Sequence, residues 1–120
     1  MKHVLIIYTG GTIGMTRSEN GYAPSTGYFR DALNAISDLH SSEMPAWDML
    51  ELSPLLDSSN MTVHEWNRIA ELIAQHYDSY DGFVVLHGTD TMAYTASALS
   101  FMLGGLDKPV VLTGSQIPLC

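Results

Sequence analysis

The sequence predicts an α/β fold in which helices flank a mostly parallel β-sheet. Short apolar runs, such as residues 3–8 and 83–86, alternate with longer segments whose apolar residues recur at helical spacing. Each of these runs leads into a turn rich in glycine and hydroxyl side chains. In parallel sheets the ligand site lies beyond the carboxyl ends of the strands, so this pattern also predicts where a site would be.

The first half of the chain is expected to hold two strands and one helix. Residues 3–8 predict a strand, and the polar residues 15–27 predict a long loop with room for a short hairpin. Apolar residues at helical spacing predict a helix over 28–39. Residues 47–52 then predict a second strand, and the polar cluster 57–60 predicts a turn.

The second half repeats the alternation. Thr62 and Glu65 have the spacing of a capping box, which predicts that a helix begins at residue 63. Residues 83–86 are too short an apolar run for a helix and predict a buried strand. A helix over 92–103 and a last strand over 110–114 complete the series.

Composition limits the classes of function. Thirteen acidic residues against five Lys and Arg give a net charge of −8, which disfavours nucleic acid and anionic membrane surfaces as partners. No apolar stretch is long enough for a membrane span and no targeting segment is evident. Cys120 is the single cysteine, so no internal disulfide is expected and a cytoplasmic location is favoured.

The turn T-G-G-T-I-G at residues 9–14 is open to several interpretations. It lacks the first glycine of a dinucleotide fingerprint and the lysine of a P-loop, although a looser phosphate nest remains an alternative. Its threonines could simply hydrogen-bond the turn, and this is the role we expect for Thr9. A threonine beside glycine could also attack a carbonyl group if a base activates it.

A second turn, H-G-T-D-T at residues 87–91, again places a threonine beside glycine between a strand and a helix. Helix capping by Asp90 or Thr91 is the alternative role. For His87 we expect a packed or hydrogen-bonded ring rather than a base, and for Trp66 a place in the core. Two such strand ends together favour a site built from two hydroxyl groups.

The two turns, read as YTGGTIG and HGTDTM, resemble the paired signature motifs of bacterial L-asparaginases. The DSSNM turn and the closing LTGSQIP match as well, and the cytoplasmic type I group is the most similar. The resemblance extends over all 120 residues. It implies a Rossmann- or flavodoxin-like fold, with residues 1–120 as the N-terminal part of the asparaginase α/β domain and a C-terminal domain that is absent from this chain.

The resemblance also implies roles for individual residues. Thr12 corresponds to the nucleophile that attacks the side-chain amide of asparagine and forms an acyl-enzyme. Tyr22 corresponds to the loop tyrosine that helps to activate it. Thr89 belongs to a hydroxyl–lysine–carboxylate group, and Asp90 holds the α-ammonium group of the substrate.

Four further residues are expected to bind substrate. Ser58 corresponds to the serine that binds the α-carboxylate, whereas the role of Ser59 is left open because this place is often Gln in the periplasmic group. Gly11 and Gly88 would let the backbone approach the substrate closely, and nearby amides could form an oxyanion hole.

The resemblance implies hydrolysis of L-asparagine, with L-glutamine as a second substrate, without cofactor or metal, in a homodimer or homotetramer of the full-length protein. Neither Lys2 nor Lys108 lies in the motif of the family's catalytic lysine, so the 120-residue chain alone is expected to be inactive. Three alternatives remain: an amidotransferase subunit of the same family, a non-catalytic amino-acid or phosphate-binding module of flavodoxin-like shape, and an inactive truncated product.

Overall fold

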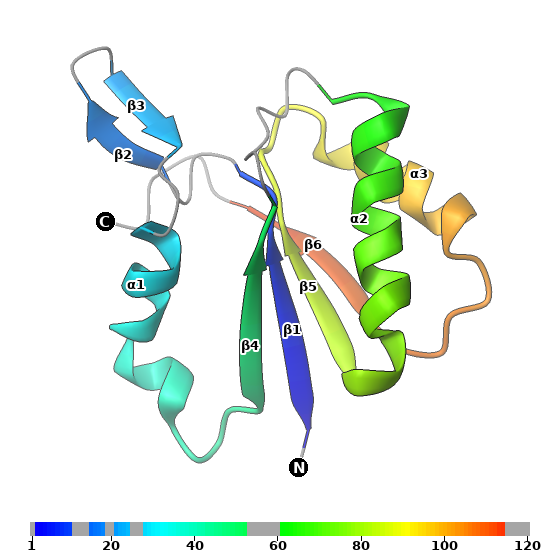
Figure 1. Cartoon of the computed structure of the whole chain (residues 1–120). Coiled ribbons are helices and arrows are strands. Elements are labelled where there is room, and N and C mark those ends of the chain that lie inside the picture. Colours follow the sequence, from blue (N-terminus) through cyan, green and yellow to red (C-terminus); the bar gives the residue numbers. More distant parts are fainter. Residues whose placement is uncertain (1, 11–14, 19–20, 25–27, 53–60, 115–120) are drawn as a thin grey trace.

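The computed structural model describes residues 2–10, 15–18, 21–24, 28–52 and 61–114. Its centre is a four-stranded parallel sheet with the strand order β4-β1-β5-β6 (Figure 1). The strands are β1 (His3–Tyr8), β4 (Ala46–Glu51), β5 (Gly82–Leu86) and β6 (Val110–Thr113). They lie within one or two residues of the predicted bounds, and the predicted α/β fold class is confirmed.

The strand order determines the path of the chain. From β1 the chain moves outward to β4, then crosses back to β5 on the other side of β1, and continues to β6. In register, Tyr8 at the end of β1 pairs with Glu51 on one side and Leu86 on the other. This is the order of flavodoxin-like sheets, in which β1 occupies an inner position.

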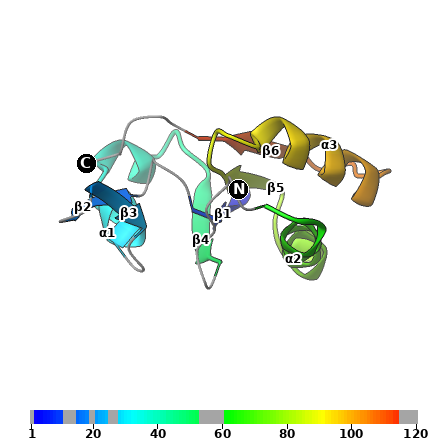
Figure 2. The same ribbon diagram turned by 90° about the horizontal axis from the view of Figure 1, so that it is seen from above.

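Helices cover both faces of the sheet. Figures 1 and 2 show α1 (Tyr28–Asn34) on one side and α2 (Val63–His76) with α3 (Met92–Met102) on the other. Because successive side chains of a strand point to opposite faces, β1, β4 and β5 each contribute to two separate cores. The core under α2 and α3 contains Leu5, Ile7, Ile69, Ile73, Phe83, Val85 and Leu99. The core under α1 contains Tyr8, Phe29, Leu33, Met49 and Leu86.

The predicted helix over residues 28–39 is interrupted. The α-helix ends at Asn34, Ile36 is extended (φ −83°, ψ 108°), and a 3₁₀ turn, η2, spans Ser37–His40. Ile36 and Leu39 still pack on the core under α1, and the indole Nε1 of Trp47 donates to the Leu39 carbonyl at 2.9 Å. The apolar spacing therefore reported burial correctly, although the backbone is not continuous α-helix.

Two other local predictions, the hairpin and the capping box, are confirmed, whereas the turn predicted at residues 57–60 lies outside the described residues. The loop contains a short antiparallel hairpin, β2 (Met15–Ser18) and β3 (Gly21–Pro24), which lies beside α1 in Figure 1. The helix α2 begins after Thr62, whose backbone N–H donates to Glu65 Oε2 at 3.0 Å. A 3₁₀ turn, η4 (Tyr77–Ser79), follows α2.

Candidate active site

The candidate site lies at the topological switch point of the sheet. The connections from β1 and from β4 lead to opposite sides of β1, so the carboxyl ends of β1 and β5 lie next to each other where the strand order reverses. Open α/β sheets bind ligands in the crevice at this position. Both signature turns of the sequence follow these two strands.

The end of β1 is tied directly to the end of β5 by Thr9. Its backbone N–H and its Oγ1 both donate to the Leu86 carbonyl, at 3.0 and 2.8 Å, and the residue is buried. Its hydroxyl is thus committed to the backbone, which confirms the expected turn-forming role. Gly10 follows with φ 130°, a conformation that only glycine adopts without strain.

The turn after β5 is held on its other side by β6. The His87 N–H donates to the Thr113 carbonyl at 2.9 Å, and Gly88 is buried. Gly114, the residue that follows β6, passes so close that a Cβ atom there would lie 2.2 Å from the His87 carbonyl oxygen. Beyond this clamp, Thr89 and Asp90 are exposed and available to a ligand.

The structure places some of the predicted site residues. Gly88, Thr89 and Asp90 lie together at the carboxyl end of β5. Tyr22 lies on β3, opposite Arg17 in the hairpin. The remaining predicted residues, Gly11, Thr12, Ser58 and Ser59, lie outside the described residues.

Both lysines of the chain lie at the amino ends of the strands, at the opposite end of the sheet from the candidate site. Lys2 precedes β1, and its carbonyl accepts the Ala46 N–H at 3.1 Å. Lys108 precedes β6, donates to the Tyr77 carbonyl, and lies 4.6 Å from the centre of the Tyr77 ring. A six-residue strand is about 20 Å long, so Lys2 cannot reach the turn that follows β1.

One titratable side chain beneath the site was not singled out from the sequence. Tyr8, the last residue of β1, is fully buried and stacks on Phe29 with ring centroids 4.5 Å apart. Burial, with a smaller contribution from Glu51, raises the pKa of Tyr8 to about 12. Its hydroxyl has no hydrogen-bond partner within the described part of the chain, and the phenol stays protonated at neutral pH.

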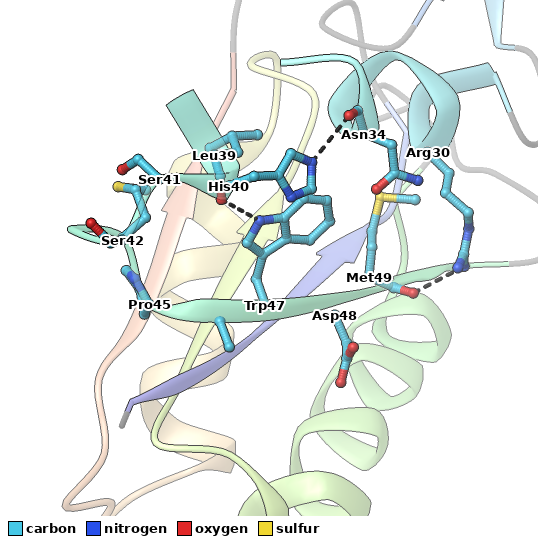
Figure 3. A pocket seen from close by; sticks show the side chains of 12 residues that line it. Arg30, Asn34, Leu39, His40, Ser41, Ser42, Pro45, Trp47, Asp48 and Met49 are labelled. Carbon is cyan, nitrogen blue, oxygen red and sulfur yellow. Dashed lines mark hydrogen bonds between the residues drawn. The ribbon is translucent and has the colours of Figure 1, made fainter. Parts of the chain in front are cut away.

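A large cavity lined by described residues lies elsewhere. It has a volume of about 520 Å³ and lies between α1, η2 and the outer edge of β4 (Figure 3). Its polar groups bind one another: Arg30 donates to the Met49 carbonyl at 2.9 Å, and His40 Nε2 donates to the Asn34 carbonyl at 3.0 Å. Because this cavity flanks the sheet rather than the carboxyl ends of its strands, we assign the candidate site to the switch point.

The described residues contain neither a metal-binding cluster nor a membrane-spanning helix. No group of three or more His, Cys, Asp or Glu side chains in these residues could hold a metal ion. Within the same residues, no helix is long and apolar enough to cross a membrane.

A polar arrangement behind the turn was also missed by sequence reasoning. His87 is buried and hydrogen-bonded as expected, but its ring meets Thr95 of α3, which in turn meets Trp66 of α2. The available signal was Thr95 itself, a hydroxyl residue on the otherwise apolar buried side of α3.

Comparison with known proteins gives one family. Residues 3–120 match the family model described as "Asparaginase, N-terminal". The chain is 60% identical over 118 residues to L-asparaginase 1 of Escherichia coli K12, covering 98% of this chain and 35% of that protein. The chain therefore spans about a third of the length of such relatives.

Solved structures agree. L-asparaginase I from Vibrio cholerae superposes with a TM-score of 0.94 at 54% identity, over 99% of this chain and 35% of the other. A probable cytoplasmic L-asparaginase from Campylobacter jejuni gives a TM-score of 0.79 at 32% identity, over 99% of this chain and 37% of that one.

Proposed function

The chain belongs to the asparaginase family, and we propose that it forms the N-terminal part of an amidohydrolase that converts L-asparagine to L-aspartate and ammonia. The observation that carries the proposal is that β1 and β5, the two strands that lead into the threonine-bearing sequences, lie next to each other at the switch point of the sheet. The 60% identity to an L-asparaginase over nearly the whole chain supports asparagine as substrate. L-glutamine is proposed as a second substrate.

The proposed reaction divides amide hydrolysis into two steps. The Thr12 hydroxyl, deprotonated with the help of Tyr22, attacks the side-chain amide carbon and the nitrogen leaves as ammonia. Water then hydrolyses the resulting ester, releasing aspartate and restoring the hydroxyl. Dividing one difficult step into two easier ones is the general advantage of covalent catalysis.

The substrate is a zwitterion, which gives the remaining residues their proposed roles. Asp90, exposed at the end of β5, offers a carboxylate to the α-ammonium group in a charge-assisted hydrogen bond. Ser58, with Ser59 beside it, is proposed to bind the α-carboxylate. Gly11 and Gly88 would allow backbone amides to approach the oxyanion.

We propose that the 120-residue chain alone is inactive. Thr89 is proposed to work with a lysine and a carboxylate, but Lys2 and Lys108 lie at the amino edge of the sheet. The lysine would then come from the part of the relatives that lies beyond this chain. For the longer protein we propose a homodimer or homotetramer in the cytoplasm.

Ammonia release tests the proposal. A longer protein of the relatives' length should release ammonia from L-asparagine, whereas purified residues 1–120 should not. Thr12→Ala in the longer protein should abolish ammonia release but retain binding of L-aspartate, measured by calorimetry. Ser100→Ala, which removes an exposed hydroxyl from α3, is the matched control and should leave turnover unchanged.

Two results would contradict the proposal. Turnover by residues 1–120 near the rate of the longer protein would show that no further lysine is needed. Undiminished turnover in a Thr12→Ala, Thr89→Val double variant would show that neither hydroxyl takes part and that another group does the chemistry.

A further inference from the structure

Behind the turn after β5, two buried side chains, His87 and Thr95, and the half-buried Trp66 form a continuous chain of hydrogen bonds. Trp66 Nε1 of α2 lies 2.8 Å from Thr95 Oγ1 of α3, and this hydroxyl lies 2.9 Å from His87 Nε2. On the other side of the ring, His87 Nδ1 lies 2.6 Å from the Gly88 carbonyl oxygen. His87 is 1% and Thr95 0% exposed, so water cannot replace these partners.

The direction of each hydrogen bond follows from its ends. The indole N–H can only donate and the Gly88 carbonyl can only accept. His87 Nδ1 must therefore carry the proton that it donates to Gly88. The Thr95 oxygen accepts from Trp66, and in a neutral ring with its proton on Nδ1 the Nε2 atom accepts the Thr95 hydroxyl proton. For a neutral His87, the chain of hydrogen bonds thus specifies the tautomer with the proton on Nδ1.

The position of His87 explains why a polar chain occurs here. Phe83, Val85 and His87 share one face of β5, and the first two belong to the apolar core under α2 and α3. His87 ends this row where the strand gives way to the turn. Buried polar groups require partners, and here the ring is bonded by Thr95 of α3, whose hydroxyl is in turn bonded by Trp66 of α2.

We propose that the Trp66–Thr95–His87 chain is a positioning device for the turn that carries Thr89 and Asp90. This inference rests on the proposed function of those two residues. The last bond of the chain holds the carbonyl of Gly88, and with it the plane of the Gly88–Thr89 peptide. The turn is clamped from the other side by the His87 N–H on Thr113. These hydrogen bonds connect the turn to the packed helices α2 and α3, and so hold the Thr89 and Asp90 side chains in a fixed orientation.

The ring proton gives the first test. Long-range ¹H–¹⁵N spectra of the 120-residue chain at pH 7 should show His87 protonated on Nδ1 only. A proton on Nε2, or on both nitrogens, would overturn the assignment. Neither result depends on turnover, so failure of this inference is distinguishable from failure of the proposed function.

Backbone order in the turn gives the second test. In the parent chain, ¹⁵N order parameters of Gly88, Thr89 and Asp90 should be about 0.85, the value of rigid backbone. Thr95→Val keeps the shape but removes both hydroxyl bonds, and should lower these values below about 0.6 without changing those of β5. Thr95→Ser should restore them.

Two further variants separate positioning from stability. Trp66→Phe removes only the first donor and keeps Thr95 bound to His87, so a smaller loss of order in the turn is expected; it also serves if Thr95→Val does not fold. Trp47→Phe is the control, because it removes a similar indole–carbonyl bond far from the turn, and turn order should be unchanged. Loss of thermal stability in Thr95→Val and Trp66→Phe with unchanged order in the turn would overturn the proposal. The Trp66–Thr95–His87 hydrogen bonds would then have a role in folding only.

Discussion

Tyr8→Phe is expected to stabilise the protein, contrary to the usual effect of removing a buried hydroxyl. The Tyr8 hydroxyl is fully buried and has no hydrogen-bond partner within the described residues. An unsatisfied buried donor costs about 1–3 kcal/mol. Phenylalanine removes this cost and keeps the ring stacked on Phe29, so the free energy of unfolding at pH 7 should rise by about 1 kcal/mol.

The same variant should change the response to alkaline pH. Tyr8 has a pKa of about 12 in the folded state and about 10 when unfolded. Above pH 10 the unfolded chain loses this proton while the native state retains it, so native stability falls until the pH passes about 12. The loss attributable to Tyr8 is about 1.4 kcal/mol at pH 11. Tyr8→Phe lacks this loss.

Urea unfolding of parent and variant from pH 7 to pH 11 measures both effects. The stability difference should start near 1 kcal/mol and widen by about 1.4 kcal/mol at pH 11. Tyr94→Phe is the control, because Tyr94 is 68% exposed, and its difference from the parent should not vary with pH. A Tyr8→Phe protein less stable than the parent at pH 7 would refute the reasoning, as would a difference that stays constant up to pH 11.

Three other outcomes are expected. Gly114→Ala should cost about 3 kcal/mol in thermal unfolding, because the new Cβ would meet the His87 carbonyl at 2.2 Å, whereas Gly104→Ala meets only the Phe101 carbonyl at 3.8 Å and should be nearly neutral. The Thr62 hydroxyl lowers the pKa of Glu65, so the ionised carboxylate stabilises the folded protein above the ordinary Glu pKa. This stabilisation disappears as the pH falls through the lowered value. The difference in free energy of unfolding between parent and Glu65→Ala, measured in urea, should therefore vanish in acid. Arg30→Met removes a hydrogen bond to Met49 at the outer edge of β4 and should cost about 1 kcal/mol with more aggregation by light scattering; equal solubility and stability would show that this contact does not protect the edge.

The sequence was sufficient to predict the strands of the parallel sheet, the three helices and the turn-forming role of Thr9. These features depend on local pattern: apolar runs for buried strands, helical spacing for covered helices, and a threonine in a tight turn. The break after Asn34 was not predictable in this way, because Ile36 and Leu39 pack, partly buried, against the core under α1 although the helix is not continuous. Apolar spacing reports which side chains are buried and carries little information about the backbone between them.

The Trp66–Thr95–His87 chain of hydrogen bonds could not be predicted from the sequence, for a different reason. His87 was interpreted correctly as a buried, hydrogen-bonded residue, whereas Trp66 is half-buried and belongs to neither core. Their connection requires Thr95 of a third element. Hydrogen-bond partners 29 residues apart depend on how α2 and α3 pack against each other and on β5. That relation is tertiary, and a single sequence contains no periodic signal for it.

The parallel topology that brings the two turns together also keeps the lysines away from them. All four strands of the described sheet run in one direction, so residues that follow strands gather at the carboxyl edge and residues that precede strands gather at the other. Thr9 and His87 belong to the first group, Lys2 and Lys108 to the second. Side-chain rearrangement cannot exchange the groups, because an extended strand of six residues separates them by about 20 Å. A lysine that works with Thr89 must therefore come from outside the connections described here, which is why we propose turnover only for a protein longer than 120 residues.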